Sequence, residues 1–138
     1  MLVLVDTPIW SLALRRKSED LNARELSLTQ ALAELIRDGR AQLVGVVRQE
    51  LLSGIRDAER FQKLRNYLRA FDDPALRADD YETAAEMHNR CRGRGIAGSA
   101  IDFLLCAVAE LRQWQIFTTD QDFEHYRRVL ELKMYEVS

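Results

Sequence analysis

Two kinds of apolar pattern alternate along this chain. Short runs of consecutive apolar residues, rich in valine, isoleucine and leucine, occupy residues 2–5, 41–47 and 115–119. Such runs are typical of strands that are buried on both faces. A further short strand is predicted at "KMYEV" (133–137), and the turn "FDDPAL" (71–76) leaves room for a brief edge strand, because its proline excludes a central one. We therefore expect a sheet of about four or five strands.

Between these runs, apolar residues recur every three or four positions, which is the spacing of amphipathic helices. One helix is expected to start at Thr7, whose hydroxyl would cap it ahead of Pro8 at the first helical position. Further helices are predicted over about 25–38, directly after 47, over 61–71, around 81–88, from Ser99 to about 113, and over 120–129. Glycines follow two of these segments and are expected to end them.

The alternation of strands and helices predicts an α/β fold in one domain, residues 1–138. Strands that are joined through helices pair in parallel, with right-handed crossovers and with helices on both faces of the sheet. In such sheets, ligands bind beyond the carboxyl ends of the strands. We therefore expect the functional side chains where the apolar runs end.

Composition narrows the class of protein. The chain is 47% hydrophobic and 30% charged, which indicates a soluble globular protein rather than a disordered one. Its net charge of −2 supplies no overall field for nucleic-acid binding, although a local basic patch would be enough. The two cysteines form no disulfide framework, the chain opens without a basic leader, and "AIDFLLCAVAEL" is too short to cross a membrane. We expect a cytoplasmic protein with no membrane partner.

Five acidic residues stand at the predicted strand ends and helix starts. Asp6 ends the first strand, and Glu50 lies one turn into the helix after the second. Asp102 lies in the first turn of the most apolar helix, and Asp120 and Asp122 follow the third strand. The predicted topology brings all five toward one edge of a parallel sheet.

Each of these acids also has a purely structural interpretation. Asp6 could cap a helix, although Thr7 and Pro8 already form a start signal, and Glu50 could interact with a helix dipole. Asp102 has the spacing of a capping box with Ser99, and Asp120 or Asp122 could be a cap or a first-turn acid. Thr118 is placed to orient one of the carboxylates by a hydrogen bond.

Their joint placement favours a metal site. Several carboxylates close together repel one another, so some stay protonated unless a cation intervenes. Mg²⁺ or Mn²⁺ takes oxygen ligands, keeps some waters and lowers the pKa of a bound water. The two histidines, His88 and His125, are far apart in the sequence, which argues against a zinc site or a serine or cysteine triad.

Four motifs, in order, resemble the acidic motifs of the PIN-domain family: "LVDTPIW", "VVRQELLSGI", "GIAGSAIDFLLCAVA" and "IFTTDQDFEHY". The length and the motif contexts are similar to those of VapC toxins from bacterial toxin–antitoxin systems. The resemblance implies a Mg²⁺- or Mn²⁺-dependent endoribonuclease that hydrolyses phosphodiester bonds in RNA, forms a homodimer and is inhibited by a small cognate antitoxin. A serine is common where this chain has Pro8.

The resemblance also implies roles for individual residues. Matched by position, the catalytic acids are Asp6, Glu50, Asp102 and Asp120, and the metal ligands are Asp6, Asp102, Asp120 and Asp122. Asp120 and Asp122 remain alternatives for the fourth acid. Thr7 matches the hydroxyl residue that often follows the first acid.

Substrate phosphates require cations near these acids. Arg92 and Arg94 lie in the glycine-rich segment just before Asp102 and are the candidates for RNA binding. Three rival functions remain open. A phosphotransfer protein would also have an aspartate at the end of the first strand, but the second acid expected two residues after Asp6 is missing. A flap-type DNA nuclease would share the acids, but the chain is short for one, and the third rival is a catalytically silent PIN-fold module that binds RNA or an antitoxin.

Overall fold

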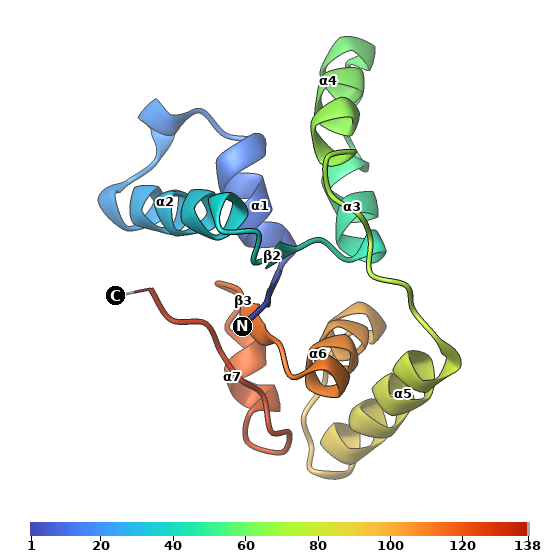
Figure 1. Cartoon of the computed structure of the whole chain (residues 1–138). Coiled ribbons are helices and arrows are strands. Elements are labelled where there is room, and N and C mark those ends of the chain that lie inside the picture. Colours follow the sequence, from blue (N-terminus) through green and yellow to red (C-terminus); the bar gives the residue numbers. More distant parts are fainter. Residues whose placement is uncertain (138) are drawn as a thin grey trace.

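The computed structural model describes residues 1–137, which form an α/β fold around a small parallel sheet (Figure 1). The elements, in chain order, are β1 (Val3–Val5), α1 (Thr7–Leu14), a 3₁₀ turn (Ser18–Asp20), α2 (Ala23–Arg37), β2 (Ala41–Gln42), α3 (Gly45–Leu52), α4 (Ala58–Leu68), α5 (Ala78–Gly93), α6 (Ala100–Arg112), β3 (Gln115–Phe117) and α7 (Asp122–Tyr126).

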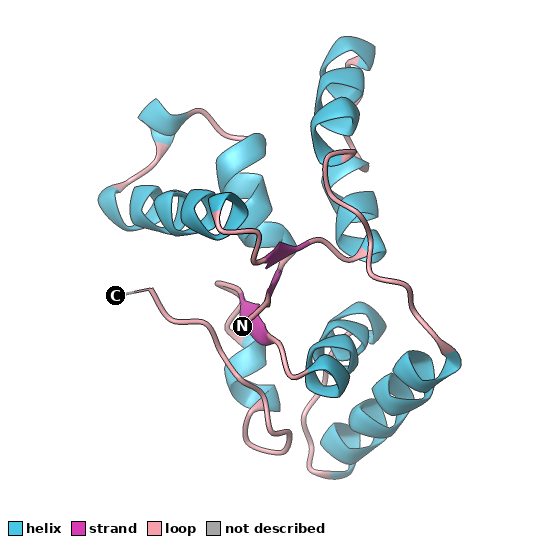
Figure 2. Ribbon diagram, in the orientation of Figure 1, coloured by secondary structure: helices cyan, strands magenta, loops and turns pink. Residues whose placement is uncertain are grey.

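The sheet has the strand order β2-β1-β3, and both pairings are parallel. Val3 pairs with Ala41 and with Gln115, so the two flanking strands start level with the central one. Helices surround the sheet: in Figure 2, where the short strands are magenta, α1 to α4 occupy the upper part of the view and α5 to α7 the lower part. The predicted fold class is confirmed.

The predicted count of four or five strands is wrong, because residues 1–137 contain three. The segment 71–76 has no strand, and the segment 133–137 contributes a single parallel bridge between Ile116 and Met134.

The predicted strand 41–47 is also too long, because β2 ends at Gln42 and α3 begins at Gly45. Val44, Val47 and Leu51 are fully buried at spacings of three and four, which is the pattern of one helix face. Helical packing therefore overrides the β propensity of the valine run. Glu50 lies in the second turn of α3, which agrees with its predicted place one turn into this helix.

The core is one cluster that includes all of β1 and a buried stretch of α6. Residues 103–109 of α6 are consecutively buried, so this helix is enclosed on every side rather than along one stripe. Both cysteines, Cys91 and Cys106, are buried and unpaired, as expected. Within the part of the chain that the structure describes, no helix combines the length and apolar character that crossing a bilayer requires.

Candidate metal and catalytic site

Asp6 leaves the central strand β1 at the carboxyl edge of the sheet. Its backbone N–H donates to the carbonyl of Phe117 at 2.9 Å, so the ends of β1 and β3 lie side by side. Its carboxylate is 5% exposed and accepts two hydrogen bonds, from the Thr7 N–H to Oδ1 and from the Thr118 hydroxyl to Oδ2, both at 2.8 Å. The predicted orientation of a carboxylate by Thr118 is confirmed.

The helix cap at this point differs from the prediction. Asp6 is the N-cap of α1, while Thr7 is already the first helical residue and Pro8 the second. The expectation that Thr7 would be the cap is wrong, because its N–H is the donor that the Asp6 carboxylate accepts. The Thr7 hydroxyl is used differently and donates to Glu50 Oε1 at 2.9 Å. Glu50 of α3 is thereby held beside the end of β1.

Asp102, Asp120 and Asp122 form the second part of the site. Each offers one carboxylate oxygen, and these atoms all lie within 4.8 Å of one another. The Asp120 N–H donates to the Thr118 hydroxyl at 3.0 Å, and the Asp122 N–H donates to Asp120 Oδ1 at 2.9 Å. Thr118 thus connects Asp6 to this group, since its hydroxyl contacts both.

The predicted capping box of α6 forms only in part. The Asp102 N–H donates to the Ser99 hydroxyl at 3.0 Å, so Ser99 is the N-cap as expected. The Asp102 carboxylate, however, accepts a hydrogen bond from the Tyr126 hydroxyl at 2.6 Å. The carboxylate is therefore held toward Asp120 and Asp122 instead of being used at the helix start.

Negative charge dominates the electrostatics of the site, because none of the five acids has an ion-pair partner among residues 1–137. Burial raises the pKa of Asp6 from 3.8 to about 6, although the two hydrogen bonds that its carboxylate accepts act to lower it. The charges of Asp102 and Glu50 add to the rise. Burial also raises the pKa of Asp102, opposed by the Tyr126 hydrogen bond and reinforced by the charges of Asp120 and Asp122. Such shifts mark carboxylates whose ionised form is destabilised by their surroundings.

This donor set fits a hard divalent cation. The potential ligands are all carboxylate oxygens, which Mg²⁺ and Mn²⁺ prefer, and the group of three contains neither histidine nor cysteine. Bringing a cation to Asp102, Asp120 and Asp122 would relieve their mutual repulsion and that of Asp102 with Asp6.

Tyr126 is a residue of the site that the sequence analysis did not identify. Its side chain is fully buried, with ring centroids 4.8 Å from Phe103 and 5.2 Å from Phe123. A Cβ atom at Gly98 would lie 2.7 Å from the Tyr126 hydroxyl oxygen, so the loop before α6 needs a glycine there. The only sequence signal was a tyrosine among apolar residues, whose hydroxyl needs a partner when buried.

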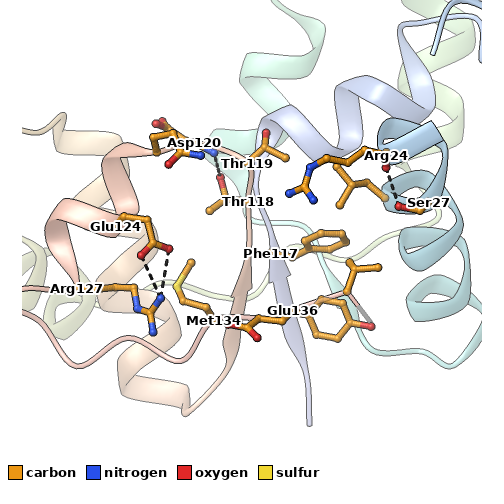
Figure 3. A pocket seen from close by; sticks show the side chains of 14 residues that line it. Arg24, Ser27, Phe117, Thr118, Thr119, Asp120, Glu124, Arg127, Met134 and Glu136 are labelled. Atoms are coloured by element: carbon orange, nitrogen blue, oxygen red, sulfur yellow. Dashed lines mark hydrogen bonds and ion pairs between the residues drawn. The ribbon is translucent and has the colours of Figure 1, made fainter. Parts of the chain in front are cut away.

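Two hollows border the acids. The first, which we call the α2 cleft, has a volume of about 700 Å³ and is walled by α2, the segment after β3, α7 and the chain from Met134 (Figure 3). The second, the loop hollow, has a volume of about 750 Å³ and is lined by residues 95–99 with Asp102, Asp122, His125 and Arg128. Asp120 lines both, so the hollows meet at the acidic group.

The predicted RNA-binding arginines lie at the end of α5. Arg92 is near the end of α5 and lies 3.3 Å from His88 Nε2, and Arg94 is the residue that follows this helix. Neither lines the α2 cleft or the loop hollow. Their role in RNA binding stays a prediction.

The sequence matches the family model of the PIN domain over residues 3–129, and the chain therefore belongs to the PIN domain family. A search of curated proteins finds no significant match.

Solved structures share the fold at low sequence identity. One chain of FitAcB from Neisseria gonorrhoeae has a TM-score of 0.76 at 17% identity, covering 98% of this chain and 97% of that one. One chain of VapBC2 from Rickettsia felis, solved with a DNA fragment from its promoter, has a TM-score of 0.73 at 16% identity and covers 98% of both chains. A toxin–antitoxin complex from Klebsiella pneumoniae has a TM-score of 0.65 at 18% identity, covering 88% of this chain and 89% of the matched one.

Proposed function

We propose that this chain is a VapC-type toxin, a Mg²⁺- or Mn²⁺-dependent endoribonuclease that hydrolyses phosphodiester bonds in RNA. One observation carries the proposal: in a PIN fold, five carboxylates from β1, α3, α6 and the β3–α7 segment converge on one sheet edge, and none of them has an ion-pair partner among residues 1–137. Burial raises the pKa values of Asp6 and Asp102, the charges of neighbouring acids add to the rise, and a bound cation would offset that charge.

We assign catalytic roles to Asp6, Glu50, Asp102 and Asp120, and the metal-ligand roles to Asp6, Asp102, Asp120 and Asp122. A bound Mg²⁺ or Mn²⁺ supplies a water of lowered pKa and offsets negative charge on the phosphate. In this assignment Thr118 orients Asp6, and Thr7 orients Glu50 through Oε1, which leaves Oε2 to accept a proton from the attacking water. Thr7, Arg92 and Arg94 are assigned to contacts with the RNA.

The biological setting is proposed from the same family. The similar structures include complexes described as toxin–antitoxin and as VapBC, which supports a small cognate antitoxin as partner in a type II system. We propose that residues 1–138 act as a single PIN domain, as a homodimer and in the cytoplasm. RNA is the proposed substrate.

The test is cleavage of a mixed RNA pool by the pure protein, with Mg²⁺ or Mn²⁺ against EDTA. We expect cation-dependent cleavage that falls by roughly 10³-fold in Asp6→Asn, within the range for loss of an acid–base or metal-binding group. Asp79→Asn, an exposed acid of α5, is the control and should cleave normally. Intact RNA with the folded wild-type protein would favour a silent binding module, and normal cleavage by Asp6→Asn would remove Asp6 from the mechanism.

A further inference from the structure

An RNA-cutting centre made of carboxylates has an electrostatic difficulty. Every nucleotide carries a negative phosphate, and the chain itself has a net charge of −2, so the acids repel the substrate that they must meet. A bound cation offsets this repulsion at the scissile phosphate only. The neighbouring phosphates need positive side chains of the protein on each side of the acids.

The two hollows beside the acids each contain one arginine that is suited to this task. Arg24, in the first turn of α2, lines the α2 cleft, and Arg128, just after α7, lines the loop hollow. Both are exposed, and neither side chain has a hydrogen-bond or ion-pair partner among residues 1–137. Arg127 also lines the α2 cleft, but its guanidinium already pairs with Glu124 at 3.2 Å.

The positions of these arginines define a path. In Figure 3, Arg24 extends from the α2 wall of the cleft toward Thr118 and Thr119, on the side of the cleft where Asp120 lies. Asp120 is also the residue at which the cleft meets the loop hollow, and Arg128 lies in that hollow. A strand that enters at Arg24 and leaves at Arg128 would therefore pass over the acidic group.

The size and character of the hollows suit single-stranded RNA. Their volumes, about 700 and 750 Å³, are within the range of pockets that enclose small ligands and have room for an unstacked nucleotide. Both are open and lined by hydroxyl and carboxylate groups as well as by the arginines, with the Gln121 amide in the α2 cleft and the His125 imidazole in the loop hollow. A single strand can follow such a bent path, whereas a stiff duplex cannot.

We propose that single-stranded RNA runs from the α2 cleft across the acids into the loop hollow, with Arg24 and Arg128 binding phosphates on opposite sides of the scissile bond. This rests on the proposed ribonuclease function. It differs from the sequence-based assignment because it places the main phosphate contacts outside the Arg92–Arg94 segment.

The test measures kcat and KM for cleavage of one single-stranded RNA oligonucleotide by Arg24→Gln, Arg128→Gln and Arg37→Gln over a range of NaCl concentrations. Arg37→Gln is the matched control, since it removes an exposed arginine without a side-chain partner from the far end of α2. Binding of the same RNA with Ca²⁺ in place of Mg²⁺ is measured by fluorescence anisotropy, so that affinity is known independently of cleavage.

We expect each of Arg24→Gln and Arg128→Gln to raise KM roughly fivefold with kcat changed by less than about twofold, because a phosphate contact contributes to binding and not to the bond that breaks. Each should also reduce the slope of log affinity against log salt by about 0.7, the value for one single-strand phosphate contact. Arg37→Gln should match the wild-type protein.

Effects equal to those of Arg37→Gln would overturn the proposal, and an effect from only one arginine would overturn the two-sided path. These results differ from failure of the proposed function, in which the wild-type protein itself neither cuts nor binds the RNA.

Discussion

Asp6 and Asp80 are both buried acids, with 5% and 2% of the residue exposed, but their hydrogen-bond partners differ in charge. Asp80, in the first turn of α5, makes two contacts with the Arg112 guanidinium, at 2.6 and 3.1 Å, and its Oδ2 also accepts the Arg77 N–H. Arg112 lowers the pKa of Asp80, principally through this hydrogen bond. The Asp6 carboxylate accepts hydrogen bonds from a hydroxyl and from a backbone amide, which are both neutral, and burial raises its pKa to about 6.

In the proposed function, this difference separates a structural carboxylate, Asp80, from a functional one, Asp6. Arg112 also donates to the carbonyls of Ala75 and Val108, so the Asp80 pair connects the start of α5 to the end of α6 with its hydrogen bonds satisfied. Asp6, Asp102, Asp120 and Asp122 lie near one another, and none of them has an ion-pair partner among residues 1–137. We propose that a bound cation offsets their charge. Burial alone would not distinguish the two regions, whereas the presence of a cationic partner does.

The largest expected effect on stability is from breaking the Asp80 pair. Asp80→Asn should lower the free energy of unfolding by about 3 kcal/mol, because the arginine stays partly buried without its counter-charge. The folded pKa of Asp80 is lowered, so this stabilisation is present at neutral pH and is lost as the pH falls below about 4. Urea denaturation at pH 7 measures the loss, and an unchanged midpoint would show that the pair is not a structural connection.

Asp6→Asn should change the free energy of unfolding in the opposite direction, when the protein is free of metal. Because the folded pKa of Asp6 is raised, the folded state binds the proton more tightly, and stability is highest below pH 4 and falls as the pH rises to about 6. Removing the charge should therefore stabilise the protein at pH 7 by about 2 kcal/mol, after allowance for one lost hydrogen bond. The measurement is urea denaturation in EDTA at pH 7 and pH 4; a variant less stable than wild type at pH 7 would contradict the account.

Tyr126→Phe should have a smaller and more specific effect. It removes the hydroxyl that holds Asp102 but keeps the ring that packs on Phe103 and Phe123. We expect roughly tenfold more Mn²⁺ to be needed for half-maximal cleavage, with little change at saturating metal, as for other residues that orient a metal ligand.

Tyr67→Phe, which removes a hydroxyl from an exposed ring of α4, is the control for that measurement. An equal metal requirement for wild type, Tyr126→Phe and Tyr67→Phe would mean that Tyr126 is only a core residue.

Much of this site was predictable from sequence because it follows topology. The carboxyl ends of parallel strands meet at one edge, so Asp6 and Asp120 could be brought together once the strands 2–5 and 115–119 were identified. The cap of α1 was assigned one residue too late, because Asp6 and Thr7 are both good caps and sequence alone does not decide which backbone is helical.

Other parts depended on contacts between distant residues. Tyr126 and Asp102 are 24 positions apart, and no local pattern pairs them. Arg24 lines the α2 cleft because the first turn of α2 lies across from the segment after β3. Arg92 and Arg94 are near Asp102 in sequence but line neither hollow. Which exposed cation lines a hollow therefore depends on how the helices pack and is not given by its distance from Asp102 along the chain.

The central claim is that the uncompensated carboxylates hold a divalent cation, and calorimetric titration of Mn²⁺ into the protein tests it most directly. The account predicts saturable binding by the wild-type protein and by Asp79→Asn, with at least about tenfold weaker binding by Asp102→Asn and Asp120→Asn. No saturable binding by the wild-type protein, or equal binding by all four proteins, would contradict it.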